Sequence, residues 1–94
     1  MKVENIESNR GNKIANQFEI RDNDTVYFQS YNSIIVKKDF DVIGQDPVKT
    51  YLDQKYWNYS NTTGKYRNIF LGETIKDTKA KIKSGEYILT DLNK

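Results

Sequence analysis

The stretch from Ser60 to Gly85, SNTTGKYRNIFLGETIKDTKAKIKSG, decides the fold because the spacing of apolar residues changes there from strand-like to helical. Ser60 is a suitable N-cap, and Gly72 can end the first helix in a left-handed conformation. Between them the apolar residues recur at i, i+3 and i+4, as Tyr66, Ile69 and Phe70. This part of the stretch predicts one short helix.

The second half of the stretch predicts another helix. Thr74 and Asp77 have the spacing of a capping box, in which each side chain bonds to the backbone of the other residue. Ser84-Gly85 then provides a stop signal. Two short consecutive helices follow from these signals.

Upstream of the helices the sequence predicts strands. Ile14 to Arg21 alternates with period two, Arg21 to Asp24 has turn residues, and Thr25 to Tyr31 alternates again, which favours a hairpin. Three more strands are expected at Ser33–Lys38, Val48–Trp57 and Glu86–Thr90, with a loop at Asp39–Pro47.

The resulting order is ββββααβ, which indicates an α+β fold. An antiparallel sheet with two short helices on one face would bury one side of each strand. The last strand should lie beside an earlier strand, because its backbone groups need partners. Residues 1–12 are polar and are expected to form a flexible arm, and residues 13–94 a single domain.

The composition restricts the chemistry. Hydrophobic residues make up 36% and charged residues 30% of the 94 residues, and histidine and cysteine are absent. Thiolate and imidazole nucleophiles, disulfides and the usual zinc sites are therefore excluded. The aspartate pairs Asp22/Asp24 and Asp39/Asp41 could offer oxygens to a cation, but turn formation explains each pair locally. We expect no enzyme activity, no metal and no cofactor.

The sequence also indicates the cellular compartment. Met1 to Arg10 lacks the apolar run of a signal peptide, and no stretch approaches the ~18 apolar residues of a membrane span. A small secreted domain of this polarity would normally need disulfides. We therefore expect a cytoplasmic protein with no membrane contact.

The small net charge of +2 conceals an uneven distribution. Residues 22–53 carry three lysines against six aspartates, a net charge of −3. Residues 60–83 carry six basic residues against two acidic ones, a net charge of +4. An anionic partner is therefore most plausible at the predicted helices.

Two basic features could form such a surface. The start of the first helix could cradle an anion with its hydroxyls and basic side chains, and the second helix carries a lysine stripe. The residues are Ser60, Thr62, Thr63, Lys65 and Arg67 in the first helix, and Lys76, Lys79 and Lys83 in the second. The alternatives are a capped helix start and a solvated helix face. The spacing excludes a P-loop, and the excess of lysine over arginine disfavours reading of base edges.

Two tyrosines form a third candidate surface. Tyr27 and Tyr31 are expected on the sheet face opposite Val26 and Phe28. Exposed tyrosines there could stack on nucleobases or anchor a protein. Cross-strand packing with Tyr51 or Trp57 is the alternative.

Several motifs resemble small uncharacterised proteins of phages and plasmids of low-GC Gram-positive bacteria. They are Phe28–Ser33, Tyr56–Tyr66, Phe70–Glu73 and Ile82–Tyr87, and the Trp-x-Tyr-Ser-x-Thr-Thr-x-Lys-Tyr core from Trp57 to Tyr66 is the most specific. The resemblance covers roughly residues 14–93 and implies a mobile-element origin without an assigned activity. Short genes of such elements often inhibit host defences, as anti-CRISPR proteins do.

These observations lead to two hypotheses. The first is a non-enzymatic intracellular binding module, of host-interaction or anti-defence type, that contacts nucleic acid or a nucleoprotein through the basic helical face. The second is a protein–protein module or homodimer that uses the tyrosine-bearing sheet face or a sheet edge, without nucleic acid. The oligomeric state and the identity of a host protein partner do not follow from the sequence.

Overall fold

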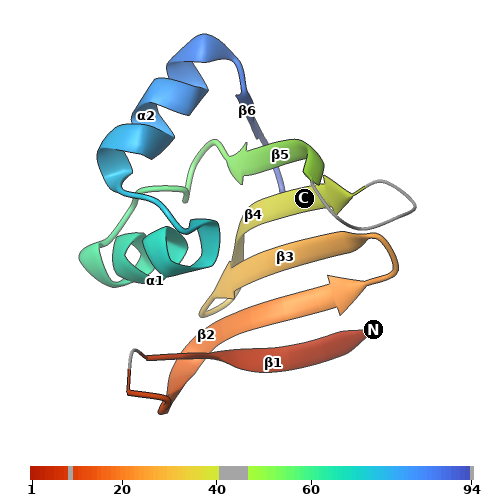
Figure 1. The fold of residues 1–94 in the computed structure, drawn as a ribbon, viewed down its shortest axis with the longest axis vertical. Coiled ribbons are helices and arrows are strands. Elements are labelled where there is room, and N and C mark those ends of the chain that lie inside the picture. The colour runs from red at the N-terminus through yellow and green to blue at the C-terminus, as the bar shows by residue number, and fades with distance from the viewer. Residues whose placement is uncertain (9, 41–46, 94) are drawn as a thin grey trace.

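The computed structural model describes residues 1–8, 10–40 and 47–93, in which six strands and two helices form an α+β fold (Figure 1). The elements are β1 (Lys2–Glu7), β2 (Lys13–Asp22), β3 (Thr25–Ser30), β4 (Ser33–Phe40), β5 (Pro47–Asp53), α1 (Asn61–Leu71), α2 (Ile75–Ser84) and β6 (Tyr87–Thr90). The predicted fold class is confirmed. Most of the predicted loop at 39–47 lies outside the described residues.

The six strands form one sheet in chain order, β1-β2-β3-β4-β5-β6. All neighbouring pairs are antiparallel except β5 and β6, which are parallel. The two helices between β5 and β6 carry the chain back along the sheet, and a parallel pair requires such a crossover. The expected place of the last strand beside an earlier one is confirmed, but the sheet is not wholly antiparallel.

Strand β1 corrects the prediction of a flexible arm at residues 1–12. Lys2–Glu7 pairs with β2, from Lys2 opposite Arg21 to Glu7 opposite Lys13. The register shifts between Asn5 and Glu7, and only Ile6 of this strand is buried. A single buried residue leaves no period-two pattern in the sequence, which is why the strand was not predicted.

Both helices begin and end where the sequence predicts. The hydroxyl of Ser60 accepts a hydrogen bond from the backbone N–H of Thr63 at 3.2 Å, and Gly72 ends α1 with φ = 70°. Thr74 and Asp77 form the expected capping box at α2, and a left-handed Gly85 ends it. Local capping chemistry therefore sets where both helices begin and end.

The strand predicted at Val48–Trp57 ends earlier, at Asp53. The buried carboxylate of Asp53 accepts hydrogen bonds from the backbone N–H groups of Lys55, Tyr56 and Leu92. This side chain closes a turn and fixes the C-terminal segment beside it. A side chain that caps a turn in this way competes with continued strand pairing.

The core lies between the sheet and the two helices, which cover the same face of the sheet (Figure 1). Its centre is formed by four strand residues with no exposed surface, Phe28, Ile35, Val36 and Leu52. The ring of Phe70 from α1 stacks on Phe28, with 5.6 Å between the ring centroids. Packing of this kind stabilises helices that are too short to be stable alone.

The predicted alternation in β2 fails at Asn16. This residue has φ = 65°, a left-handed conformation that interrupts the pleat. As a result Ile14 packs against the core, whereas Phe18 and Ile20 lie on the other face, and Gln17 is completely buried. The sequence pattern had placed Ile14 and Phe18 on the same side.

Candidate functional site

The predicted anion cradle at the start of α1 is used internally. The Ser60 hydroxyl caps the helix, and the completely buried Thr63 forms a 2.9 Å hydroxyl–hydroxyl hydrogen bond with Ser30 of β3. Thr62 is exposed. The hydroxyls of Ser60 and Thr63 therefore dock α1 on the sheet.

Arg67 has the same internal role, because only 1% of its surface is exposed. Its Nη1 donates to the carbonyl of Trp57 at 2.7 Å and to Asn58 Oδ1 at 3.1 Å, and its Nη2 donates to Asn68 Oδ1 at 3.0 Å. The guanidinium lies 5.3 Å from the Trp57 ring centroid. Burial lowers the pKa of Arg67. Arg67 joins α1 to the segment before it and is not accessible to an anion.

The remaining basic residues of this surface are lysines, and all of them are exposed: Lys65, Lys76, Lys79 and Lys83. The Lys65 ammonium lies over the neighbouring Tyr66 ring, 5.4 Å from its centroid. Of the four lysines of α2, Lys76, Lys79 and Lys83 lie outside the ion pairs found among the described residues, whereas Lys81 pairs with Glu73. The structure therefore separates this predicted surface into residues with internal structural contacts, Ser60, Thr63 and Arg67, and an exposed part made of Thr62 and four lysines.

A buried polar cluster that the sequence did not reveal connects α2 to β6. The Glu73 carboxylate, with a side chain only 7% exposed, accepts hydrogen bonds from Lys81, Tyr87 and Thr78. The donor–acceptor distances for Lys81 Nζ and Tyr87 Oη are both 2.7 Å. Glu73 occurs in the sequence as an isolated acidic residue, and only the fold brings these partners to it.

The titration of this cluster disfavours acid–base chemistry near neutral pH. Burial raises the pKa of Glu73, but hydrogen bonds from Lys81, Thr78 and Tyr87 outweigh it and leave the pKa below its usual value. The pKa of Tyr87 is raised to about 12, first by burial and then by its hydrogen bond to Glu73. The hydrogen bond to Glu73 raises the pKa of Lys81 to about 12. A general acid or base needs a pKa nearer to the working pH.

A small cavity of about 270 Å³ adjoins this cluster and is lined in part by Lys38, Lys49 and Leu71. Burial lowers the pKa of Lys38, whose ammonium lies over the Phe70 ring, 4.7 Å from its centroid. Lys38 therefore packs against the core through its stem and its charge.

Of the two predicted surface tyrosines, only Tyr27 lies on the sheet face away from the helices. Tyr31 lies in the turn between β3 and β4 with φ = 55° and is 48% exposed. The left-handed backbone takes it out of the alternation that the sequence indicated. The placement of Tyr27 and Tyr31 on one face was therefore wrong, although both are at the surface or partly exposed.

The strand register instead places Tyr27 in a row that crosses the whole sheet. Each residue of the row is the direct partner of the next, one from every strand: Val3, Ile20, Tyr27, Lys37, Tyr51 and Ile88. Val3 is 53% exposed and Ile88 is 38% exposed at the two ends. We call this set the open-face row, because both helices cover the opposite face (Figure 1).

The open-face row is apolar and aromatic except for one central lysine. The Lys37 ammonium lies 5.7 Å from the centroid of the Tyr51 ring. A second row from β2 to β5 carries Asp22, Thr25, Asp39 and Lys49, with a 3.1 Å hydrogen bond from Thr25 Oγ1 to Asp39 Oδ1. Together the two rows contain two lysines and two aspartates, so the net charge of the two rows is zero.

The described residues contain no group of three or more aspartate or glutamate side chains arranged to hold a metal ion. Of the aspartate pairs considered above, Asp41 lies outside the described part of the chain. Neither helix is long and apolar enough to cross a membrane, as far as the described residues extend.

Comparison with known proteins identifies the family to which the chain belongs. The family model described as a family of unknown function (DUF8033) matches residues 1–88. The chain belongs to this family. The matched residues include β1 and all three surfaces described above, but the family has no assigned activity that would give a role to any of them. No curated protein and no solved structure gave a significant match.

Proposed function

We propose that the chain is a non-enzymatic binding module that docks a partner protein on the open face of its sheet. The observation that carries the proposal is the open-face row, which sets five apolar or aromatic residues around Lys37 on a face without helices. Aromatic residues are enriched in the centres of protein interfaces. Lys37 would meet a carboxylate of the partner, because its own row holds no anion.

The charge of this face favours protein over nucleic acid. A nucleic-acid surface gains most of its affinity from cations that neutralise phosphates. The two rows carry equal numbers of lysines and aspartates. The aspartates would repel a phosphate backbone and cancel the attraction of the lysines. Tyr27 and Tyr51 could still stack on bases, but stacking without cations would give weak binding.

The size of the face is suited to a transient partner. Six strands at ~4.8 Å spacing and about six residues of length give a flat area of roughly 500 Å². Standard interfaces bury about 800 Å² on each partner, and transient ones bury less. The open face is therefore the size of a small, transient interface.

Site-specific photocross-linking tests this proposal. Tyr27→benzoylphenylalanine places a probe in the open-face row, and Tyr59→benzoylphenylalanine is the matched control, since Tyr59 is 47% exposed elsewhere. In a Gram-positive host we expect one discrete protein adduct from position 27 and none from position 59. No adduct from position 27, or an adduct with nucleic acid, would overturn the proposal. An adduct between two copies would identify the partner as a second copy of the chain.

The exposed lysines of α2 support nucleic-acid binding as a second candidate function. Lys76, Lys79 and Lys83 take part in none of the ion pairs among the described residues and could follow a phosphate backbone. A gel-shift assay with single- and double-stranded DNA and RNA across a salt series tests it. Binding that weakens with salt and is lost in Lys76→Gln/Lys79→Gln/Lys83→Gln would support this candidate; no binding at low salt would contradict it.

We propose further that the module acts in the cytoplasm of a bacterial host as a phage or plasmid protein of host-interaction or anti-defence type. The support is the resemblance of the Trp57–Tyr66 core to proteins of such elements. Expression in a host with an active CRISPR system, followed by phage plating, tests this role. Unchanged phage yield relative to a Tyr27→Ser/Tyr51→Ser variant would contradict it.

A further inference from the structure

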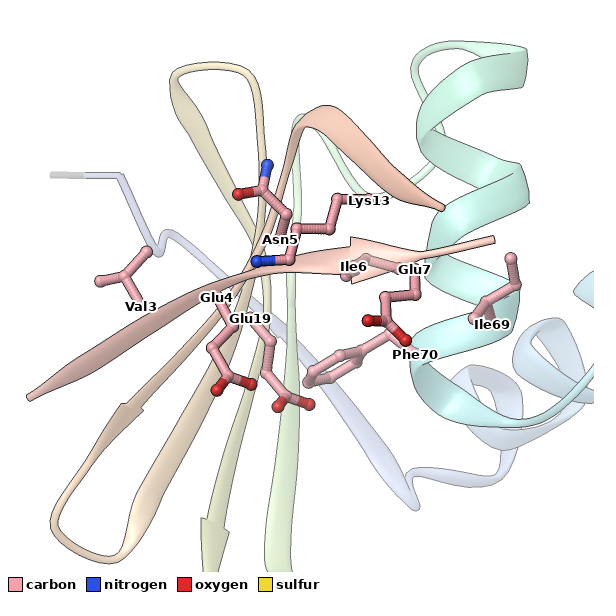
Figure 2. Close-up of a pocket in the computed structure, with 9 residues that line it drawn as sticks. All are labelled: Val3, Glu4, Asn5, Ile6, Glu7, Lys13, Glu19, Ile69 and Phe70. Atoms are coloured by element: carbon pink, nitrogen blue, oxygen red, sulfur yellow. The ribbon is translucent and has the colours of Figure 1, made fainter. Parts of the chain in front are cut away.

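A groove of about 590 Å³ lies between the first edge of the sheet and α1 (Figure 2). It is lined by five successive residues of β1, two of β2 and two of α1: Val3, Glu4, Asn5, Ile6, Glu7, Lys13, Glu19, Ile69 and Phe70. Because an unbroken run of β1 lines it, the groove follows the strand along its length.

The backbone of β1 is open on its outer side. β1 is the first strand of the sheet and pairs only with β2 among the described strands. An edge strand presents a row of N–H and C=O groups that can pair with an added strand. A groove between an edge strand and a helix is a common place for an extended peptide to bind, since main-chain bonds give affinity and pockets give specificity.

The wall of the groove is acidic. Glu4 of β1 and Glu19 of β2 are direct cross-strand partners, and Figure 2 shows their carboxylates side by side, below the strand. Each carboxylate forms an ion pair with a neighbouring cation: Lys2 Nζ lies 3.0 Å from Glu4 Oε1, and Arg21 Nε lies 3.3 Å from Glu19 Oε2. The hydrogen bond from Lys2 lowers the pKa of Glu4 and keeps it ionised. Two like charges in direct opposition repel each other, and a further cation between them would relieve this.

The floor of the groove is apolar. Ile6 is buried, Ile69 is 41% exposed and Phe70 packs on the core below it. Glu4 pairs with Glu19, which is the partner of Phe28. Ile6 belongs to the core cluster that contains Phe28, so Glu4 and Ile6 lie on the same side of the sheet. A strand added beside β1 would thus set one side chain near Glu4 and Glu19 and another, two residues away, near Ile6 and Phe70.

We propose that β1 and this groove bind an extended peptide by strand addition, with a lysine or arginine against Glu4 and Glu19 and an apolar side chain two positions away against Ile6 and Phe70. Three glutamates and one lysine line the groove, and the cations that pair with Glu4 and Glu19, Lys2 and Arg21, are largely exposed. Exposed ion pairs of this kind contribute little, so a lysine or arginine of the peptide can replace them. This site shares only Val3 with the open-face row and does not depend on the function proposed for that face.

Fluorescence anisotropy with labelled seven-residue peptides tests the proposal on the intact chain. The probe has a central Lys-Thr-Leu between threonines, and its matched control has Glu-Thr-Leu. We expect the lysine peptide to bind at least tenfold more tightly at low ionic strength. Equal affinity of the two peptides, or no binding of the lysine peptide, would overturn the proposal.

Two N-methylated forms of the lysine peptide test strand addition itself, since methylation removes the N–H donors along one edge of the peptide. One form should lose binding and the other should keep it; equal binding of both would overturn strand addition. On the protein, Glu4→Gln/Glu19→Gln should weaken binding at least fivefold, whereas Glu86→Gln, at an exposed carboxylate outside the groove, should not. Because the peptide comparisons leave the protein unchanged, they decide the question even if a variant folds poorly.

Discussion

Tyr27 and Phe28 are neighbours on β3, yet they lie on opposite faces of one sheet and have different roles. Phe28 has no exposed surface and stacks on Phe70 of α1. Tyr27 lies on the face without helices, between Ile20 and Lys37. The covered face thus uses its residues for folding, whereas the open face carries apolar side chains that the helices do not cover.

Polar residues sharpen this contrast. On the covered face, Arg67 and Glu73 are held by several hydrogen bonds each, and both connect helices to their surroundings. On the open face the charged residues balance one another, and Lys37 is the single cation of its row. The charges of Arg67 and Glu73 are therefore structural, whereas Lys37 on the open face is available to a partner.

The largest expected effect is at Phe28. Phe28→Ala should lower the free energy of unfolding by about 3–5 kcal/mol, because it removes a buried ring and leaves a cavity. Small domains have total stabilities of about 5–15 kcal/mol, so the variant should be close to unfolding. Urea denaturation followed by circular dichroism measures this. A loss below about 1 kcal/mol would remove the distinction between the two faces.

The next largest loss of stability is expected on substitution of Arg67. Arg67→Ala leaves the Trp57 carbonyl and two asparagine side chains without their donor and should cost about 2–4 kcal/mol. Lys65→Ala, two residues away and exposed, is the control and should change stability by less than about 0.5 kcal/mol. Both values come from urea denaturation at low and high salt. A stable Arg67→Ala variant with weakened anion binding would instead make Arg67 part of a binding surface.

The Glu73 cluster predicts how stability depends on pH. Because the folded pKa of Glu73 lies below its ordinary 4.5, the stabilisation from this group is present above pH 4.5 and is lost as the pH falls through the folded value. The pKa values of Tyr87 and Lys81 are both raised to about 12, so their contributions are present below pH 10 and are lost as the pH rises toward 12.

Glu73→Gln tests this dependence. The substitution should lower stability at pH 7 by roughly 1–3 kcal/mol, since hydrogen bonds to a charged acceptor are replaced by weaker ones. The substitution should also make the loss of stability at acidic and at alkaline pH smaller than in the wild type. Glu7→Gln, at an exposed carboxylate of β1 outside this cluster, is the control. If both variants follow the wild-type pH profile, Glu73 does not couple α2 to β6.

The smallest effect on stability is expected at Tyr27. Tyr27→Ala removes one cross-strand contact on a partly exposed face and should cost less than about 1 kcal/mol. Denaturation of Tyr27→Ala and Phe28→Ala under identical conditions compares adjacent residues directly. A cost for Tyr27 similar to that for Phe28 would mean that the open-face row is structural.

Much of this fold follows from local sequence. The helix caps at Ser60 and Thr74 and the strand pattern of Thr25–Ser30 act over a few residues, and the structure agrees with them. β1 was missed because it buries only Ile6 and its pairing depends on β2. Left-handed backbones interrupt the expected alternation at Asn16 within β2 and take Tyr31 out of β3 into a turn.

The candidate sites follow from sequence less well, because they depend on contacts between distant residues. The basic residues of α1 and α2 look equivalent in the sequence, but Arg67 is buried and Lys76 is exposed. Tyr27 and Tyr51 belong to one row only through the register of β3, β4 and β5. The groove beside β1 requires a strand that the sequence pattern did not indicate.

Photocross-linking from Tyr51 tests the central claim most directly, because Tyr51 lies in the open-face row beside Lys37. With Tyr51→benzoylphenylalanine we predict a discrete protein adduct in cells, and a yield at least fivefold lower when Lys37→Glu is added. The same probe at Tyr59 should give no adduct. Equal yields at positions 51 and 59, or a yield unaffected by Lys37→Glu, would contradict the assignment of the open face as the docking surface.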